Sequence, residues 1–253
     1  ASNNSQAVVI AMYGNTNLGV GSVILISDTG AIVTGQSMWE YKLQGEITSV
    51  SPVSGGQVGT RVTIRGVGLL GSGTAVDKVE LANVTASQII SSNDSVIVVS
   101  AGSGVAGTGD VIITSNTGST VKLGGGWTYQ LVGSISSVQP SSGQVGTGVR
   151  ISGTSLFGYG SRVISVTLSG VEVANITAQS NGIVDVIAAR GASNVVGVNG
   201  SIVLTADSGA VVTGGVTWQY LAEGIIATVY PQVGQGGTTV SIAGNRLLGG
   251  GAH

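Results

Sequence analysis

Residues that could do covalent chemistry are few in this sequence. His253 is the only histidine, it stands at the chain end, and there is no cysteine. A nucleophile–base pair would therefore need a serine beside a lysine or a carboxylate. Lys42 and Lys122 lie at different distances from their nearest tryptophans, so the lysines do not share a register in the repeat described below. We expect no active site, no enzymatic activity and no cofactor.

Acidic residues and glycines are the next candidates, for calcium and for phosphate. Asp28, Asp94, Asp110 and Asp207 lie at or beside predicted turns, but they do not cluster as a calcium loop requires. Hairpin-turn chemistry explains them better, and we expect no metal site. The glycine-rich stretch 66–73 does not lead into a helical pattern, as a phosphate-binding loop would. It predicts a flexible connection between strands.

Asparagine sequons are the best candidates for a modified site. Asn83 and Asn175 lie in similar strings, Leu-Ala-Asn-Val-Thr-Ala and Val-Ala-Asn-Ile-Thr-Ala, which suggests the same place in two copies of a repeat. A turn that was simply duplicated would explain the similarity equally well. Further sequons begin at Asn3, Asn93 and Asn199. N-glycans at these sites would solvate a surface that is poor in charge.

Tryptophan recurs in a fixed setting. Trp39, Trp127 and Trp218 each precede a tyrosine by two positions. Such residues could form a stacking platform for sugar rings. One tryptophan per copy, at a constant place in a final strand, is more typical of a core position between two sheets. We therefore predict that all three belong to module cores.

The elements that must position these residues are short strands. Apolar residues come in short runs rich in valine and isoleucine, separated by glycine, serine, threonine and asparagine, which is typical of strands joined by tight turns. Glycine accounts for 44 of the 253 residues, and good helix formers are scarce. No apolar run approaches the roughly 18 residues of a membrane span. The chain is predicted to be all-β, without a membrane span in this segment.

Charge is scarce as well. Only 8% of the residues are charged, 9 basic and 11 acidic, for a net charge of −2. Nucleic-acid binding normally leaves a basic stripe, and none is present, so we expect no nucleic-acid partner. A nearly neutral surface gives little repulsion between copies, which favours self-association.

The sequence repeats itself along its length. Pro52, Pro140 and Pro231 close similar strings, with spacings of 140 − 52 = 88 and 231 − 140 = 91 residues. The three tryptophans keep the same two spacings. Two independent markers in one register indicate a tandem array of modules.

Two complete modules and two partial ones follow from this register. We predict complete modules at 45–131 and 132–221, the second half of a module at 1–44, and the beginning of another at 222–253. We expect the sequence to be a window of a longer array. In the alternative, the C-terminal part of one molecule and the N-terminal part of another together form a nearly whole module. Their combined length is shorter than one period, so at least one strand would be missing.

Seven strands are predicted in the first complete module. They lie near Thr48–Pro52, Arg61–Gly66, Asp77–Ala82, Val84–Ile89, Ser95–Ser100, Asp110–Thr114 and Thr120–Tyr129. The proline that ends the first strand cannot donate to a ladder, which favours an edge strand or one that changes sheets. Seven short strands in one period are typical of an immunoglobulin-like sandwich.

The opening strings carry a family resemblance. Residues 47–66, with one extra glycine, and 135–153 read Ile-x-x-Val-x-Pro, then Gly-x-x-Gly-Thr, then Val-x-Ile-x-Gly. With the apolar pairs Leu69-Leu70 and Leu156-Phe157 and the closing Trp-x-Tyr, the chain resembles the IPT/TIG domain family. The resemblance implies tandem immunoglobulin-like sandwiches arranged end to end. Members serve in surface and fibrocystin-like proteins, in Rel-type transcription factors and beside catalytic barrels. This chain, without a basic loop, cysteine or barrel, is most similar to the multi-copy surface group.

The expected function follows from the array. We expect an extracellular or cell-surface structural protein that forms a rod or filament, such as a surface fibre, flagellar hair or wall component. Its partners would be copies of itself or neighbouring modules. The alternative is an adhesion array that recognises a glycan or a protein, which predicts that Leu69-Leu70 and Leu156-Phe157 are exposed in a shared patch. A third possibility, an enzyme accessory domain, requires a catalytic domain outside this sequence.

Overall fold

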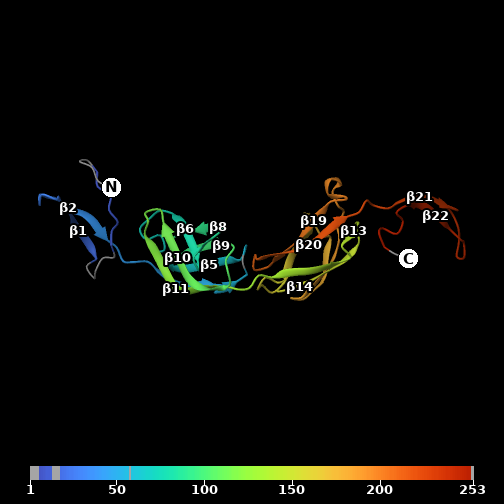
Figure 1. Ribbon diagram of the computed structural model, residues 1–253, viewed down its shortest axis with the longest axis horizontal. Coiled ribbons are helices and arrows are strands. Elements are labelled where there is room, and N and C mark those ends of the chain that lie inside the picture. The colour runs from blue at the N-terminus through green and yellow to red at the C-terminus, as the bar shows by residue number, and fades with distance from the viewer. Residues whose placement is uncertain (1–5, 13–17, 57, 252–253) are drawn as a thin grey trace.

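The chain is a row of β-sheet units. The computed structural model describes residues 6–12, 18–56 and 58–251, and the all-β prediction is confirmed. Figure 1 shows a hairpin, two sandwiches and a strand pair following one another along the long axis, with the two termini at opposite ends. Among the described residues no helix is long and apolar enough to cross a membrane.

Module 1 consists of β3–β11, which form two sheets. Its strands are β3 (Glu46–Ser51), β4 (Ser54–Gly55), β5 (Arg61–Val67), β6 (Val76–Leu81), β7 (Val84–Thr85), β8 (Gln88–Ser92), β9 (Val96–Ser100), β10 (Gly107–Ser115) and β11 (Thr120–Tyr129). One sheet has the order β3-β5-β9-β8 and the other β4-β11-β10-β6-β7.

Module 2 consists of β12–β20 and repeats this topology. Its strands are β12 (Ser134–Gln139), β13 (Ser142–Gly143), β14 (Gly148–Thr154), β15 (Val163–Leu168), β16 (Val171–Glu172), β17 (Asn175–Gln179), β18 (Ile183–Ile187), β19 (Asn199–Ala206) and β20 (Val211–Tyr220). The sheet orders are β12-β14-β18-β17 and β13-β20-β19-β15-β16. A short 3-10 turn, η1 (Ser193–Val195), precedes β19.

The terminal units are halves of the same design. The hairpin β1 (Gly19–Ile26) and β2 (Ile32–Tyr41) forms a two-stranded sheet, and so does the pair β21 (Ile225–Tyr230) and β22 (Ser241–Asn245). The register of β1–β2, with its irregularity after Gly21, is the register of β10–β11. The register of β21–β22 is likewise that of β12–β14.

Proline marks the point where the first strand changes sheets. Pro52 lies between β3, which pairs with β5, and β4, which pairs in parallel with β11 in the opposite sheet. The sheet-switching prediction is confirmed, although the two-residue strand β4 was not predicted.

One strand prediction was wrong. The stretch 84–89 was predicted as a single strand, but β7 pairs with β6 while β8 pairs with β9 in the other sheet. The backbone crosses between sheets at residues 86–87, where the hydroxyl of Ser87 donates to the carbonyl oxygen of Ser100.

Each module encloses its own core. In β5 and β9 every second side chain is fully buried, as the alternation of faces in a strand requires. The buried side chains of module 1 form one cluster and those of module 2 another. The two sandwiches are therefore complete packing units that meet only through their surfaces.

Candidate functional site

The junction between modules 1 and 2 is made by a loop and a turn. The loop between β4 and β5 of module 1 meets the turn between β19 and β20 of module 2. The amide of Val211 donates to the carbonyl oxygen of Val58 at 3.0 Å, and the amide of Arg61 donates to that of Ser208 at 2.9 Å. Because both bonds join main-chain atoms, they fix how one module sits on the next.

Two glycines allow the backbones to approach this closely. A Cβ atom on Gly59 would lie 2.2 Å from the carbonyl oxygen of Gly209, and a Cβ on Gly209 would lie 2.5 Å from that of Gly59. Both residues also have positive φ angles, +95° and +84°, which disfavour any side chain. The junction therefore requires glycine on each side.

The extra glycine of module 1 belongs to the same contact. A Cβ on Gly56 would lie 3.2 Å from the carbonyl oxygen of Gly158 and 3.4 Å from the Cβ of Ala210. Ala210 is only 1% exposed. The insertion noticed in the opening string thus places a residue without a side chain against module 2.

Glycines at the equivalent places of other units are surrounded by open space among the described residues. Gly146 stands at the place of Gly59 in module 2, and Gly118 and Gly30 stand at the place of Gly209 in module 1 and in the N-terminal hairpin. Their φ angles, +85°, +83° and +82°, match those of the junction glycines, but no atom of the described residues lies within 4 Å of the position that a Cβ would take. These are open copies of the two halves of the junction.

A different set of contacts joins module 2 to the C-terminal pair. The side-chain oxygen of Gln144 accepts a hydrogen bond of 2.8 Å from the amide of Gly224. Arg190 forms an ion pair with Glu223, with 3.1 Å between Nη1 and Oε2. The connecting segments, 130–133 and 221–224, are equally short, so module 2 lies directly next to module 1 on one side and to the C-terminal pair on the other.

The structure corrects the predicted equivalence of two sequons. Asn83 lies in the turn between β6 and β7, whereas Asn175 begins β17 in the other sheet. The true counterpart of Asn83 is Gly170, since both are the second residue after the end of equivalent strands, β6 and β15, and have φ angles of +66° and +78°. Asparagine tolerates this left-handed conformation better than most residues, which gives Asn83 a backbone role.

The other sequon asparagines do not form a shared site. Asn93 accepts bonds from the amides of Ser95 and Val96 through its side-chain oxygen and so shapes a turn. Asn199 begins β19, and its side chain is exposed, as are those of Asn83 and Asn175. Asn3 lies outside the described residues.

Predicted turn acids bind backbone amides. Asp94 accepts from the amide of Leu70, and Asp207 accepts from the amide of Ser161 at 2.8 Å. Asp110 is held by Lys122, which lowers the pKa of its carboxyl group together with the amide of Gly125. The described part of the chain holds no group of three or more residues suited to bind a metal.

Two further charged groups pair on the surface of module 2. The guanidinium of Arg150 donates two hydrogen bonds to Asp185 across β14 and β18. This pairing lowers the pKa of Asp185. The pair therefore joins two neighbouring strands, and both oxygens of Asp185 are engaged by the guanidinium.

Tryptophan occupies two environments. Trp127 and Trp218 are 0% exposed, and each meets its tyrosine edge to face, with ring centroids 5.6 and 5.9 Å apart. Burial raises the pKa of both tyrosines, Tyr129 and Tyr220. Neither buried tryptophan is available to stack against a ligand.

Trp39 is an exception. It is 46% exposed, although it meets Tyr41 in the same edge-to-face geometry. The core position of Trp39 stays a prediction, because the sequence holds only half of its module and the hairpin is a two-stranded sheet whose side chains are almost all exposed.

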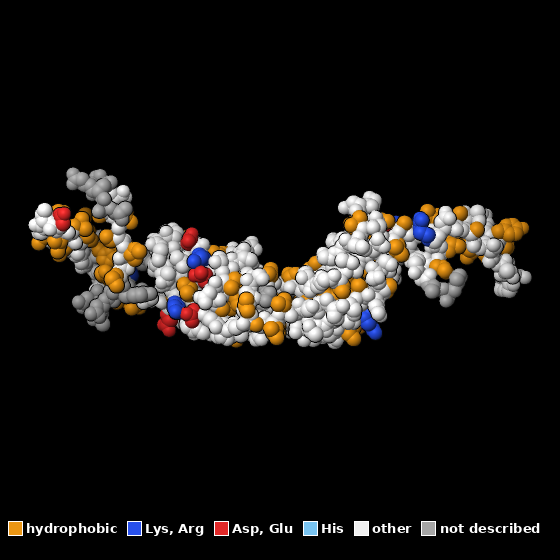
Figure 2. All heavy atoms as spheres, in the orientation of Figure 1, with side chains coloured by type: hydrophobic (Ala, Val, Ile, Leu, Met, Phe, Trp, Pro, Cys, Tyr) orange, Lys and Arg blue, Asp and Glu red, His pale blue; other side chains and the backbone are white. Residues whose placement is uncertain are grey.

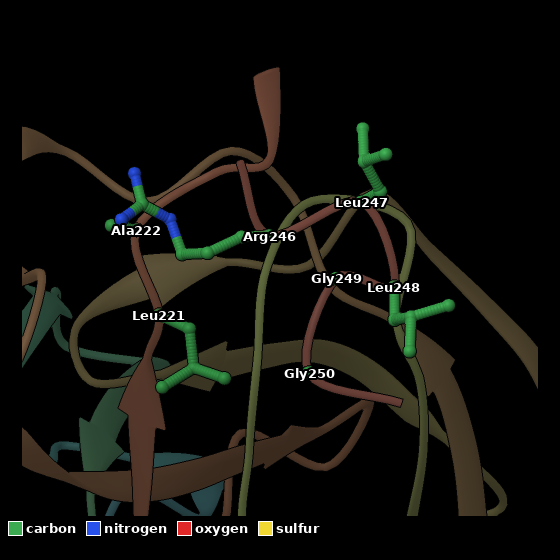
Figure 3. A pocket seen from close by; sticks show the side chains of 7 residues that line it. All are labelled: Leu221, Ala222, Arg246, Leu247, Leu248, Gly249 and Gly250. Atoms are coloured by element: carbon green, nitrogen blue, oxygen red, sulfur yellow. The ribbon is translucent and has the colours of Figure 1, made fainter. Parts of the chain in front are cut away.

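The apolar pairs do not form the exposed patch that a ligand-binding array predicted. Leu69 and Leu156 are 0% exposed, and Phe157 packs against the core of module 2. The corresponding Leu247 is 47% exposed and lines a shallow depression of about 370 Å³ with Leu221 and Arg246. Figure 3 shows these side chains on two neighbouring segments, one with Leu221 and Ala222 and the other running from Arg246 to Gly250. The depression is thus the uncovered core position of a half-module.

Sequence reasoning missed the junction. The motif Gly-x-x-Gly-Thr carries the family resemblance and the acids beside the turn glycines indicate hairpins, but neither pattern indicates a contact between modules. Their meeting across two modules depends on the three-dimensional arrangement, and the extra Gly56 was the one sequence signal that distinguished module 1.

Comparison with known proteins follows the modular division. Residues 46–129 and 134–220 both match the profile of the IPT/TIG domain. No curated protein matches the sequence. Among solved structures, SGBP-B from a complex xyloglucan utilization locus in Bacteroides uniformis is 17% identical, with a TM-score of 0.30 over 74% of this chain and 56% of that one.

Two more solved structures illustrate the range of neighbours. SGBP-B from a mixed-linkage glucan utilization locus of Bacteroides ovatus is 13% identical, with a TM-score of 0.29 over 83% of this chain and 55% of that one. The I9–I11 tandem from titin is 7% identical, with a TM-score of 0.27 over 80% and 74%. The chain thus spans little more than half the length of the two SGBP-B proteins.

Proposed function

The chain belongs to the IPT/TIG domain family, and on this premise we propose that it is an extracellular structural array that forms a rod or filament and has no chemistry of its own. The observation that carries the proposal is the junction, in which main-chain hydrogen bonds and paired glycines hold one sandwich on the next. A chain of loosely tethered binding modules would not need such a contact.

Three properties support a role in spacing. The connecting segments are short, each module has a closed core, and few charges oppose the packing of neighbours. In an array of this kind, each module contacts mainly its neighbours, and length follows from the number of copies. Such an array suits a surface fibre, a flagellar hair or a wall component.

A substitution at the junction tests the proposal. In Gly59→Ala, the added Cβ collides with the backbone of Gly209, and we expect the angle between the modules to become variable. Because the chain has no cysteine, spin labels on cysteines introduced at the exposed residues Ser92 and Ser193 would report the distance between modules. We expect one narrow distribution for the unsubstituted chain and a broad one for the variant.

The matched control is Gly146→Ala. Gly146 has a similar positive φ angle, so alanine costs about 1 kcal/mol or more of local strain in both variants. Only Gly59, however, faces another module. Equal distributions for the Gly59→Ala variant and the unsubstituted chain would remove the support for a rigid array.

Ligand recognition at the cell surface is the second candidate. Tyr159 favours it, because this aromatic residue is 45% exposed and follows Gly158, which lies against Gly56 at the junction. Exposed aromatic rings are the surfaces on which sugar rings stack, and SGBP-B from Bacteroides ovatus was solved with a mixed-linkage heptasaccharide. Glycan-array binding in the absence of regular filaments would favour this candidate.

Glycosylation is a separate expectation of the surface role. The exposed sequon asparagines Asn83 and Asn175 should carry N-glycans when the chain passes through a eukaryotic secretory pathway. Glycopeptide mass spectrometry would measure the occupancy of each site. Asn93 is the internal comparison, because its side-chain oxygen is already engaged in a turn. Finding both Asn83 and Asn175 bare would contradict the expectation.

A further inference from the structure

The turn between β17 and β18 holds one of the two Asn-Gly pairs in the sequence. Asn181-Gly182 forms this turn, and Asn199-Gly200 begins β19. In such a pair the backbone nitrogen of the glycine can attack the side-chain carbonyl carbon of the asparagine, because glycine carries no Cβ to obstruct the approach. The surroundings of each pair decide whether this attack takes place in the folded protein.

Two backbone amides hold the carbonyl oxygens of Asn181. The amide of Phe157 donates to the side-chain oxygen Oδ1 at 3.0 Å, and the amide of Leu156 donates to the main-chain oxygen, also at 3.0 Å. Negative charge develops on Oδ1 when a nucleophile attacks the side-chain carbonyl carbon. A fixed amide at this oxygen lowers the barrier to the attack, as a donor in an oxyanion hole does.

The attacking amide, that of Gly182, is only weakly held. Its nitrogen lies 3.4 Å from the hydroxyl oxygen of Ser180, a long hydrogen bond. No described atom is nearer than 3.7 Å to the position that a Cβ of Gly182 would take, so the peptide has room to turn. In module 1 the equivalent amide, that of Ser95, donates to Asn93 at 2.9 Å.

Module 1 already carries the product of such a reaction at the equivalent position. Asp94 accepts from the amide of Leu70 through its carboxylate and from the amide of Leu69 through its main-chain oxygen, both at 3.0 Å. Asn181 makes the same two bonds in module 2. An aspartate at position 181 therefore fits its loop, and its hydrogen bond to the loop amide would gain strength from the charge.

The second Asn-Gly pair lies in a strand. Gly200 pairs with Trp218 in the ladder between β19 and β20, and a Cβ on Gly200 would lie 2.5 Å from the Cα of Ser169. Ring closure requires the peptide group between asparagine and glycine to rotate. The ladder and the close packing oppose this rotation unless the strand opens locally. Asn199 should therefore persist as asparagine in the folded protein.

We propose that Asn181 is a modification site, at which the folded chain converts this asparagine into aspartate and isoaspartate with the amide of Phe157 as the stabilising donor. The nitrogen of Gly182 loses its proton to hydroxide and bonds to Cγ of Asn181. The Cγ–Nδ2 bond breaks, and the departing nitrogen takes a proton from water, so that ammonia leaves and hydroxide is regenerated. The product of this step is a cyclic imide.

Water opens the imide in one of two ways. Addition to Cγ breaks the bond from Cγ to the ring nitrogen and gives aspartate. Addition to the main-chain carbonyl carbon breaks the other bond to that nitrogen and gives isoaspartate, whose main chain runs through Cγ. Overall, water is consumed and ammonia is released, and nothing is oxidised or reduced.

Both products change the charge of module 2. Residues 134–220 hold equal numbers of basic and acidic residues, and Figure 2 shows few charged side chains on this module. Either product adds a negative charge. Isoaspartate also lengthens the main chain by one carbon, so the bonds to the loop 155–158 must be remade. Because Gly158 lies against Gly56 at the junction, we expect isoaspartate to loosen the contact between the modules.

Ageing of the whole 253-residue protein at mildly alkaline pH tests the proposal. Trypsin cleaves after Arg162 and Arg190, so Asn181 and Asn199 fall in different peptides, and mass spectrometry follows the conversion of each. Asn181 should convert in the native protein at least as fast as in guanidinium chloride. Asn199 should convert about tenfold or more slowly in the native protein than in the denaturant, because β19 must open first. Electron-transfer fragmentation distinguishes isoaspartate from aspartate.

Two variants complete the test. Gly182→Ala should slow the conversion of Asn181 by about tenfold or more, since a Cβ obstructs the attack and raises its barrier. Asn181→Asp should elute with the aspartate product in ion exchange. Both should keep the circular dichroism of the unsubstituted protein, because the Cβ at 182 has space and module 1 accommodates Asp94 at the equivalent position.

Three results would overturn the proposal. The first is conversion of Asn181 that is slower in the native protein than in guanidinium chloride, which would remove the role of the Phe157 amide. The second is native conversion of Asn199 at the rate of Asn181. The third is an unchanged rate in Gly182→Ala, which would show that the nitrogen of residue 182 is not the attacking group.

Discussion

Replacing Trp127 with alanine is expected to cost module 1 about 3–5 kcal/mol of its free energy of unfolding. The side chain is 0% exposed, lies in the core cluster of its module and packs edge to face on Tyr129. Its removal leaves a cavity between two sheets that cannot close without moving backbone. Because a domain of this size is stable by only about 5–15 kcal/mol, module 1 would lose a large share of its stability.

The repeat supplies the controls for this prediction. Trp218→Ala should affect module 2 in the same way, whereas Trp39→Ala should cost less than about 1 kcal/mol, because Trp39 is already half exposed. Hydrogen exchange, measured peptide by peptide with mass spectrometry, reports the stability of each module separately. Since the cores are separate, exchange in module 2 should not change in Trp127→Ala. An equal loss of stability in Trp39→Ala and Trp127→Ala would contradict the difference in burial between these two tryptophans.

Gly153→Ala is expected to destabilise module 2 by about 3 kcal/mol or more. A Cβ on Gly153 would lie 2.0 Å from the carbonyl oxygen of Ser134, in the strand that pairs with β14, and 2.7 Å from Leu156. The obstacle is backbone, which cannot rotate away as a side chain can. Relief would require the separation of β12 from β14, which exposes part of the core.

A second glycine in the same strand provides the comparison. Gly148 also lies in β14, but the nearest atom to its Cβ position is 4.0 Å away. Gly148→Ala should change the stability by less than about 1 kcal/mol, in the stabilising direction, because alanine restricts the unfolded chain. Urea unfolding monitored by circular dichroism would measure both variants. Similar urea midpoints for the Gly153→Ala and Gly148→Ala variants would show that the backbone of β12 leaves room for a side chain at Gly153.

The fold was largely predictable because its signals are local and repeated. Proline and tryptophan kept one register over three copies, and short apolar runs bounded by glycine predicted strands. The sheet change at Pro52 followed from the missing amide of proline. These inferences needed no knowledge of which segments meet in space.

The errors arose where local similarity and spatial equivalence differ. The strings around Asn83 and Asn175 look alike, yet Asn83 lies in a turn and Asn175 starts a strand. The residue of module 2 that lies in the turn equivalent to that of Asn83 is Gly170. The stretch 84–89 has the pattern of one strand, but its two ends pair in opposite sheets. Strand pairing decides both cases, and a single sequence does not record it.

The candidate site was less predictable than the fold. The glycines that form the junction carry no side chain, and their role depends on a carbonyl oxygen some 150 residues away in the sequence. Trp39 and Trp127 stand in the same sequence context, but their neighbours in space differ, so the sequence alone does not distinguish the exposed tryptophan from the buried one. Composition and motifs predicted the module, whereas the contacts between modules required coordinates.

The main-chain character of the junction has a consequence for how such a protein can diversify. Since the step from module 1 to module 2 is set by peptide groups and by glycines, outward-facing side chains can change through mutation without altering it. Modules could gain or lose surface side chains and loops while the distance from one module to the next stays constant, provided that the paired glycines are retained.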